Sequence, residues 1–399
     1  MTVTTTSSLR LAALLALTAA LGPLALDAYL PSFPAIAADF GIEIHAVSLT
    51  ISAYVFVISF GQLVGGPLSD RFGRQPVLLS GLALFSLASL GASQAHTLEQ
   101  LLLWRMLQAI GGGCAVVCVP ALVRDRMQGR DAAKLFSLIG LTGVAAPAIA
   151  PSLGSLLLTL GGWNTVFWFL TFYAAGVLVI LKLRLFRGPQ LPPAAPSLSL
   201  WRRYGVVLQT RPALRFMFLQ AFAFSVMLLF ITHSSFIYQQ HFGVSPSLFG
   251  LFFGANILMM LTMNLANRRL LNRFAPQQIL RAALTLQACG LAALLLIMSF
   301  SPQLWLFLPA MMITIGAIGA IGPNNMACCM EFFAVNGGTA AALMGAMQFS
   351  VAGTLSALSV LLPENVTAII LAQAACSLVC LLLVWWPFPP PIEARPPLS

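Results

Sequence analysis

Long apolar runs alternate along the chain with short polar connections. Each run has about twenty residues or more, the length that an α-helix needs to cross a lipid bilayer. The runs are too long and too uniformly apolar for the strands of an outer-membrane barrel, in which apolar and polar residues alternate. The pattern predicts an all-α integral membrane protein with twelve transmembrane helices, at residues 9–31, 45–68, 76–94, 98–123, 133–160, 163–186, 212–240, 246–266, 277–299, 302–327, 337–361 and 364–386.

A basic, proline-rich stretch separates the sixth of these spans from the seventh. Its prolines, at positions 189, 192, 193 and 196, argue against a folded domain there. The triplets Asp70-Arg71-Phe72 and Asn272-Arg273-Phe274 lie 202 residues apart, and each follows the second span of its set, which indicates a parallel repeat. We therefore expect two pseudo-symmetric six-helix bundles, at 1–186 and 212–399, joined by a cytoplasmic linker at 187–211.

Charge is scarce and its placement is asymmetric. Charged residues make up 8% of the chain and the mean hydropathy is +0.93, whereas a soluble domain carries about a quarter charged residues. Apart from Arg105, the lysines and arginines fall in the connections and span ends on one side of the membrane, and the opposite connections carry acids and histidines but no lysine or arginine. By the positive-inside rule this side is the cytoplasm and holds both termini. The net charge of +10 therefore implies no nucleic-acid partner.

The seven cysteines all fall inside apolar runs. Cys114 and Cys118 are four residues apart on one helix face, but no histidine or acid joins them. We interpret the cysteines as packing residues. The sequence predicts no disulfide framework, no metal site and no cofactor.

Very few ionisable residues fall inside the spans, and each is a functional candidate because burying it in hydrocarbon is costly. Asp27 lies near the outer end of span one and Arg105 in the outer part of span four, at similar depths. Such a pair lowers the burial cost of both groups. The alternatives are a proton-coupling pair, which forms and breaks during transport, and a static ion pair that holds two helices together.

Neutral polar side chains in the spans are candidates for a substrate cavity. Phe and Met residues are interspersed with them, which suits bulky amphipathic ligands better than sugars or phosphates. The alternative for any single aromatic residue is lipid contact or helix packing. The predicted cavity residues are Tyr29, Tyr54, Gln108, Gln220, Asn256 and Gln348.

Span five contains two prolines four residues apart, Pro147 and Pro151, followed by Gly154. Each proline removes a backbone hydrogen bond from the helix, and small residues allow close approach of neighbouring helices. The segment is therefore a candidate fulcrum or seal, with ordinary tolerance of proline in membrane helices as the alternative.

A short, highly charged connection lies between the second and third spans and reads Gly66-Pro-Leu-Ser-Asp-Arg-Phe-Gly-Arg-Gln-Pro76. This hairpin resembles the loop signature of the major facilitator superfamily. The resemblance implies the twelve-span fold of that superfamily and a cytoplasmic gate. In that gate Asp70 would face the start of span eleven near Gly337, and Arg74 would pair with Asp125. The gate residues are Gly66, Asp70, Arg71, Gly73, Arg74 and Asp125.

Other motifs resemble one branch of that superfamily, the Bcr/CflA-type drug-resistance transporters. They are Asp27-Ala-Tyr-Leu-Pro31, Arg105-Met-Leu-Gln108, the antiporter motif Pro147 to Gly154, and Gly322-Pro-Asn-Asn325 with Gly338-Thr-Ala340. The resemblance implies drug:proton antiport with Asp27 and Arg105 handling the proton. The chain departs from the pattern at Ser155, at Asn164 and at Arg184 to Arg187, which affects substrate assignment more than transport.

The combined prediction is a secondary transporter and not an enzyme. It would be a multi-pass monomer in the lipid bilayer of the bacterial inner membrane, and it would export small amphipathic drugs or toxic compounds by exchange for protons. The alternatives on the same fold are export of one specific metabolite and proton symport. A membrane-embedded enzyme would need a cluster of His, Asp or Glu at one membrane face, and the sequence offers isolated examples. A non-transporting sensor would not need the pair Asp27 and Arg105.

Overall fold

The computed structural model describes residues 5–126, 129–186, 200–333, 337–363 and 365–385. Within these residues all regular structure is helical and no strand occurs. Eleven helical stretches of this part are long and apolar enough to cross a membrane, and α7 adds the apolar segment Ala145–Gly161 at the fifth predicted span. The prediction of an all-α integral membrane protein is confirmed.

The helices fall into a first set, α1 to α8, and a second set, α10 to α16, with α9 between them. The first set comprises α1 (Thr5–Ala19), α2 (Leu21–Asp27), the short 3-10 helix η1 (Leu30–Ser32), α3 (Phe33–Phe40), α4 (Ile44–Phe72), α5 (Arg74–Ala92), α6 (Leu98–Arg126), α7 (Gly129–Gly161) and α8 (Asn164–Arg184). The second set comprises α10 (Arg211–Ser235), η2 (Phe236–His241), α11 (Pro246–Leu270), α12 (Pro276–Phe300), α13 (Leu304–Gly316), α14 (Ile318–Met330), α15 (Gly337–Leu358), η3 (Ser359–Leu361) and α16 (Val366–Trp385).

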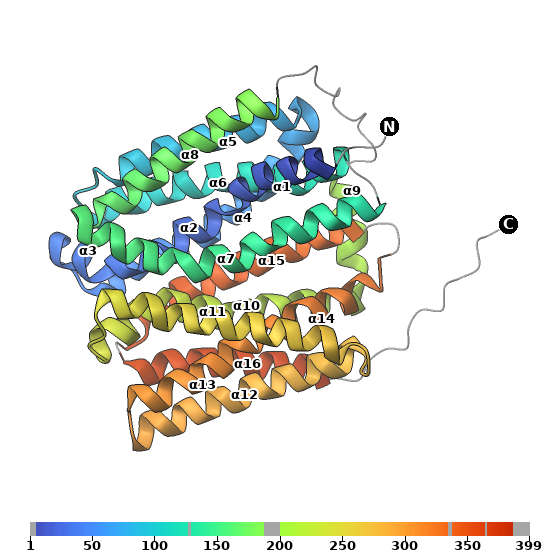
Figure 1. Cartoon of the computed structure of the whole chain (residues 1–399). Coiled ribbons are helices and arrows are strands. Elements are labelled where there is room, and N and C mark those ends of the chain that lie inside the picture. Colours follow the sequence, from blue (N-terminus) through green and yellow to red (C-terminus); the bar gives the residue numbers. More distant parts are fainter. Residues whose placement is uncertain (1–4, 127–128, 187–199, 334–336, 364, 386–399) are drawn as a thin grey trace.

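Each set packs mainly on itself, and two helix pairs make the most extensive contacts between the sets. Helix α6 packs against α4 and α5 in the first set, and α10 packs against α15 and α16 in the second. Between the sets α4 lies along α15 and α7 lies along α11 (Figure 1). A relative motion of the two sets would have to change the packing of α4 on α15 and of α7 on α11.

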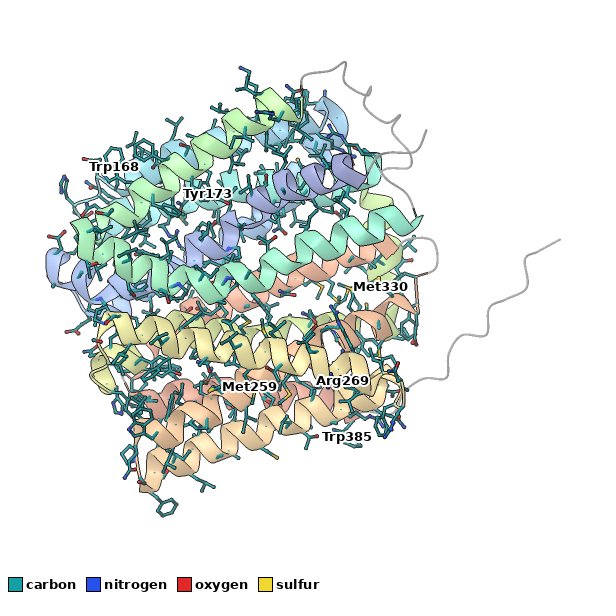
Figure 2. All side chains as sticks on the ribbon, in the orientation of Figure 1. Trp168, Tyr173, Met259, Arg269, Met330 and Trp385 are labelled. Atoms are coloured by element: carbon teal, nitrogen blue, oxygen red, sulfur yellow. The ribbon has the colours of Figure 1, made fainter. Side chains whose placement is uncertain are left out.

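The helices run roughly alongside one another, so the molecule has two ends. We call them the α3–α4 end, where α3 ends and α4 begins, and the hairpin end, where Gly73 joins α4 to α5. Figure 1 shows α3 at the first end and α9 at the second. Figure 2 places Trp168 toward the α3–α4 end, and Arg269 and Trp385 at the hairpin end.

Span one is longer than predicted and is interrupted by its prolines. The apolar stretch continues from Leu11 to Phe40, whereas the sequence pattern placed its end at residue 31. Proline lacks a backbone N–H, so Pro23 and Pro31 leave the carbonyl four residues earlier without its helical partner. The helix breaks between α1 and α2 and again after Asp27, but the backbone stays in the helical region at Ala28 and Tyr29. The prolines interrupt the span without ending it.

Two further elements differ from the sequence prediction. Span ten, predicted as one helix at 302–327, consists of α13 and α14, which meet at Ala317. The linker contains a helix, α9 (Leu200–Gln209), which packs against α15 and α10. The prolines that argued against a folded domain in the linker all precede Leu200, so they do not interrupt this helix.

Glycines allow α4 and α6 to lie in near backbone contact. A Cβ atom on Gly65 would lie 2.9 Å from the Cα of Cys114, and one on Gly113 would lie 2.7 Å from the carbonyl oxygen of Ile58. The predicted gate residue Gly66 has more room, since its Cβ would meet only Val117, at 3.9 Å. The hairpin itself depends on Gly73, which has φ +94°, a conformation that other residues rarely adopt.

Candidate functional site

Arg105 lies fully buried in α6 and has no carboxylate partner among the described residues. Its Nη1 donates hydrogen bonds to the carbonyl oxygen of Ala25, at 3.0 Å, and to Oε1 of Gln108, at 2.6 Å. Gln108 in turn donates from Nε2 to the hydroxyl of Ser89, at 2.7 Å. The atoms Nε and Nη2 of Arg105 have no hydrogen-bond partner.

Three rings surround the guanidinium group, and we call them the aromatic cage. The Cζ atom of Arg105 lies 4.3 Å from the ring centroid of Tyr54, 4.9 Å from that of Tyr29 and 6.0 Å from that of Phe167. A desolvated cation–π contact is worth about 2 kcal/mol, and a hydrogen bond from a charged donor about 1.5–3 kcal/mol. Together they offset a burial cost of several kcal/mol for the cation.

Asp27 does not pair with Arg105 in this conformation, which speaks against a static ion pair, and the proton-coupling role of the two residues stays a prediction. No oxygen of Asp27 lies within 4.0 Å of a nitrogen of Arg105. The carboxyl group is buried, with 4% of the residue exposed, and its Oδ1 has no hydrogen-bond partner.

The geometry of span one explains why the two groups stay apart. At 3.6 residues per turn, Ala25 and Tyr29 lie about 40° apart around the helix axis, whereas Asp27 lies about 200° from Ala25. Ala25 and Tyr29 both contact Arg105. Asp27 therefore projects from the opposite face of span one. Asp27 and Arg105 were expected to meet because they lie at similar depths in the membrane. The rotation of span one about its axis keeps them apart.

The predicted cavity residues separate into three places. Tyr29, Tyr54 and Gln108 are fully buried around Arg105 in the first set. Asn256 is buried in α11, where its Nδ2 donates to the carbonyl oxygen of Phe252, at 2.7 Å. Gln220 and Gln348 are half-buried in the second set, joined by a hydrogen bond of 3.0 Å.

The last pair belongs to a row of amides that links three helices. Asn325 of α14 donates to Oε1 of Gln220 in α10, at 3.0 Å, and Gln220 donates to Oε1 of Gln348 in α15. Asn325 also donates to the carbonyl oxygen of Phe216. The sequence analysis counted Asn325 among the motif residues but assigned it no partner.

The segment from Pro147 to Gly154 lies where the first set meets both span one and the second set. A Cβ atom on Gly154 would lie 1.9 Å from the carbonyl oxygen of Ala28, so α7 touches the backbone of span one there. Ser152 faces Gly250 of α11, and the hydroxyl of Ser155 lies 2.7 Å from the carbonyl oxygen of Pro246. The departure at Ser155 thus contributes a hydrogen bond between the two sets.

Hydroxyl groups join the two sets along α4 and α15. Ser52 bonds to Ser356 at 2.7 Å, and Ser356 bonds to Thr232 of α10 at 2.7 Å. Ser59 bonds to Ser350 at 3.0 Å. We call these five residues the serine seal. The hydrogen bonds of the seal and of Ser155 join the two sets, and the α3–α4 end is closed in this conformation.

The hairpin is held by Arg74. Its Nε donates to Oδ2 of Asp125 at 3.0 Å, so the predicted pairing of Arg74 with Asp125 is present, and its Nη1 contacts Asp70 and Ser69. Arg71 lies over the ring of Phe72, at 5.2 Å. All these contacts stay within the first set.

The linker helix lies near the hairpin. Burial raises the pKa of Tyr204 in α9, and the negative charge of Asp70 raises it further. The predicted contact of Asp70 with the start of span eleven near Gly337 stays a prediction.

Sequence analysis missed several contacts that depend on residues far apart in the chain. Phe167 joins the aromatic cage from α8, and the serines of the seal come from helices about three hundred positions apart. Ser52 and Ser59 are seven residues apart, on one face of α4, which is the signal that could have indicated a polar seam. In the described part of the chain no group of three or more His, Cys, Asp or Glu side chains could hold a metal ion.

These features define a class of membrane protein. The first of two sets of membrane-spanning helices contains a buried arginine and a separate buried acid, and the two sets meet across contacts that close one end. This is the architecture of a secondary transporter. The family model of the Major Facilitator Superfamily matches residues 15–357. The chain belongs to the Major Facilitator Superfamily, and it is a transporter and not an enzyme.

Relatives and solved structures agree with this assignment. The chain is 27% identical over 383 residues to the Bicyclomycin resistance protein homolog of Haemophilus influenzae, covering 92% of this chain and 93% of the relative. It is 36% identical over 177 residues to the Multidrug resistance protein MdtL of Escherichia coli, 44% of each chain. The structure of a D-xylose-proton symporter matches with a TM-score of 0.77 at 16% identity, covering 96% of this chain and 98% of that one, which is a similarity of fold.

Proposed function

We propose that this transporter exports small amphipathic compounds across the bacterial inner membrane in exchange for protons. The similarity to relatives named for bicyclomycin resistance and multidrug resistance supports a drug-type substrate. The aromatic cage of the first set and the amide row of the second supply apolar surface and a few hydrogen-bonding groups, which suits such ligands.

The observation that carries the proposal is the state of Asp27. It is buried, and its Oδ1 has neither a cation nor a hydrogen-bond donor beside it. A carboxylate in such surroundings needs a proton or a positive charge to remain there. Opening the protein around Asp27 would let the proton leave. Arg105, held in its cage at a similar depth, would stabilise the charged carboxylate if span one turned toward it.

The positive-inside rule places the hairpin end in the cytoplasm, together with both termini, and the α3–α4 end outside. In this orientation the described conformation is closed to the outside. We propose that the hairpin residues Gly66 to Arg74, with Asp125, close the cytoplasmic side when the α3–α4 end opens. Residues 1–186 and 212–399 would then move as two bodies within a monomer, with Pro147, Pro151 and Gly154 at the fulcrum.

Proton entry supplies the energy for export. Each entering proton gains about 2.3 kcal/mol per 100 mV of membrane potential and about 1.4 kcal/mol per pH unit. Because Asp27 is the acid well inside the spans, we expect one proton per cycle. Export of a neutral substrate would then move net charge, whereas export of a monovalent cation would be electroneutral.

The test is substrate uptake into energised inside-out vesicles by wild type and Asp27→Asn. We expect the variant to lose proton-driven uptake and to retain exchange of labelled for unlabelled substrate, because exchange needs no net proton movement. Glu43→Gln is the matched control, since Glu43 is an exposed acid outside the spans, and it should behave as wild type. Full proton-driven uptake in Asp27→Asn would contradict the coupling role.

A drug-susceptibility panel identifies the breadth of the substrate range. Overexpression should raise resistance to several amphipathic compounds, and Asp27→Asn should abolish the increase. Resistance to a single compound would point instead to a specific exporter on the same fold.

A further inference from the structure

Two buried histidines face each other between the sets at the α3–α4 end. His45 lies in the first turn of α4 and His233 in the last turns of α10. Their rings are stacked, with centroids 4.9 Å apart and planes inclined by 25°. The residues are 5% and 1% exposed. The pair is distinct from Asp27 and Arg105.

The hydrogen bonds of His233 identify which nitrogen can take a proton. Ser359 donates its hydroxyl hydrogen to the carbonyl oxygen of Ser356, at 2.6 Å, so it can only accept from His233. The Nε2 of His233, 2.7 Å from that hydroxyl, is then the N–H donor. Its Nδ1 is bare and has no partner, and neither nitrogen of His45 has a partner.

Charged groups that could stabilise an imidazolium are absent from the described surroundings of the pair. No described carboxylate oxygen lies within 4.0 Å of either ring, and the group that acts electrostatically on His233 is His45. From η3, the hydroxyl of Ser359 reaches His233. The other Asp, Glu and His residues at this end are Asp39 of α3, which accepts a hydrogen bond from Trp163, the exposed Glu43, His96, Glu99 and His241, and Glu364, which lies outside the described residues.

The two histidines lie next to the serine seal. Thr232, next to His233, shares the hydroxyl of Ser356 with Ser52. These bonds are neutral, and water can replace them on opening at little net cost. Each ring belongs to a different set of helices, so a repulsion between the rings acts directly against the closed contact.

We propose that His45 and His233 form a second proton-binding site, which opens the α3–α4 end when both rings are protonated. Two like charges in stacked contact, with no acceptor for the added N–H groups, disfavour the closed conformation. When the two sets of helices separate, both imidazole rings become exposed to water. An imidazole exposed to water has a pKa of about 6.5, so an acidified exterior favours the open conformation, in which both rings are exposed.

This inference rests on the proposed function for one point, that the α3–α4 end faces outside. Protons would then promote the outward opening in which the transporter releases substrate and collects its driving proton. Each ring that gains a proton only on opening shifts the equilibrium by up to about tenfold per pH unit.

The experiment measures the width of the α3–α4 end in the full-length protein as a function of pH. Spin labels are placed at Ala38→Cys in α3 and Ser247→Cys in α11, which are exposed positions on the two sets, with the exposed Cys289 replaced by serine. All variants carry Asp27→Asn, so that the first proton site does not titrate. Distance distributions are recorded between pH 8 and pH 5, a range that brackets the histidine pKa of about 6.5.

We expect the open fraction of the parent protein to rise about tenfold or more over this range. His45→Phe keeps a stacked ring without a proton site, and His233→Gln keeps a donor for Ser359, so both variants should stay closed at every pH. His241→Gln, an exposed histidine at the same end, is the matched control and should follow the parent.

A parent protein that does not open at low pH would overturn the proposal, as would equal opening in His45→Phe and His233→Gln. These outcomes are separate from failure of the proposed function. If Asp27→Asn abolishes proton-driven uptake while the distances stay constant with pH, the histidine site alone is refuted. If Asp27→Asn transports normally while the parent opens in acid, the histidine site stands and the coupling role of Asp27 fails.

Discussion

Gly154→Ala should weaken the packing of α7 against span one. The added Cβ would lie 1.9 Å from the carbonyl oxygen of Ala28 and 2.7 Å from its carbonyl carbon. Ordinary van der Waals contact lies at about 3.5 Å, so the helices would have to separate by roughly 1.5 Å. The neighbour is backbone, which cannot rotate away as a side chain can.

The magnitude follows from the cost of overpacking. Inserting a methyl group into a packed interior costs about 1–3 kcal/mol, and a backbone neighbour places this site at the upper end. Alanine gains about 1 kcal/mol over glycine in a helix, so the net destabilisation is about 2 kcal/mol. In Gly143→Ala, in the same helix, no atom lies within 4 Å of the added Cβ. This variant should therefore show only the stabilisation of about 1 kcal/mol that alanine gives over glycine in a helix.

Thermal unfolding of the purified variants measures the difference. The two alanine variants differ by about 3 kcal/mol, and we expect the Tm of Gly154→Ala to lie roughly 5 °C below that of Gly143→Ala. Export by Gly154→Ala should fall by more than about tenfold, because a free-energy change of about 1.4 kcal/mol in the closed conformation already shifts its population tenfold. Equal Tm values and equal export in the two variants would refute the close approach of α7 and span one.

Arg105→Lys keeps the charge but removes the planar group that bonds Ala25 and Gln108 and stacks on Tyr54, so export in inside-out vesicles should fall about tenfold while the protein still folds. Unchanged export would show that charge alone is needed. Asp70→Asn removes a half-exposed partner of Arg74, which contributes less than about 1 kcal/mol to stability, so Tm should hold while the transport rate falls several-fold. Equilibrium binding of substrate, measured beside the initial rate, should be unchanged; weaker binding at a normal rate would contradict a gating role.

The pattern of apolar runs was sufficient to predict the membrane-spanning helices, because a lipid bilayer restricts which backbone structures can cross it. A run of about twenty apolar residues has few alternatives to a spanning helix. The pairing of Arg74 with Asp125 followed from a motif in which both residues flank short connections. The prediction for span one failed at its end because Pro31 normally signals a helix boundary, and here the chain resumes as η1 and α3 in the same direction.

The separation of Asp27 from Arg105 could not be predicted from depth alone. Two residues at one level in neighbouring spans meet only if both helices are rotated toward each other. Ala25 and Tyr29 turn toward Arg105, and Asp27 turns away. Nothing within span one specifies that rotation, because its residues are apolar on nearly every face.

The sequence by itself determined the number and approximate place of the spans, the side on which the positive charge gathers, and the motifs that indicate a transporter. The tertiary structure decided which buried groups meet: Arg105 with an aromatic cage, Gly154 with the backbone at Ala28, and His45 with His233 across the two sets. The reason is physical. Hydropathy is a property of each residue and its neighbours in sequence, whereas a contact between His45 and His233 depends on how two sets of helices, far apart in the chain, are rotated and packed.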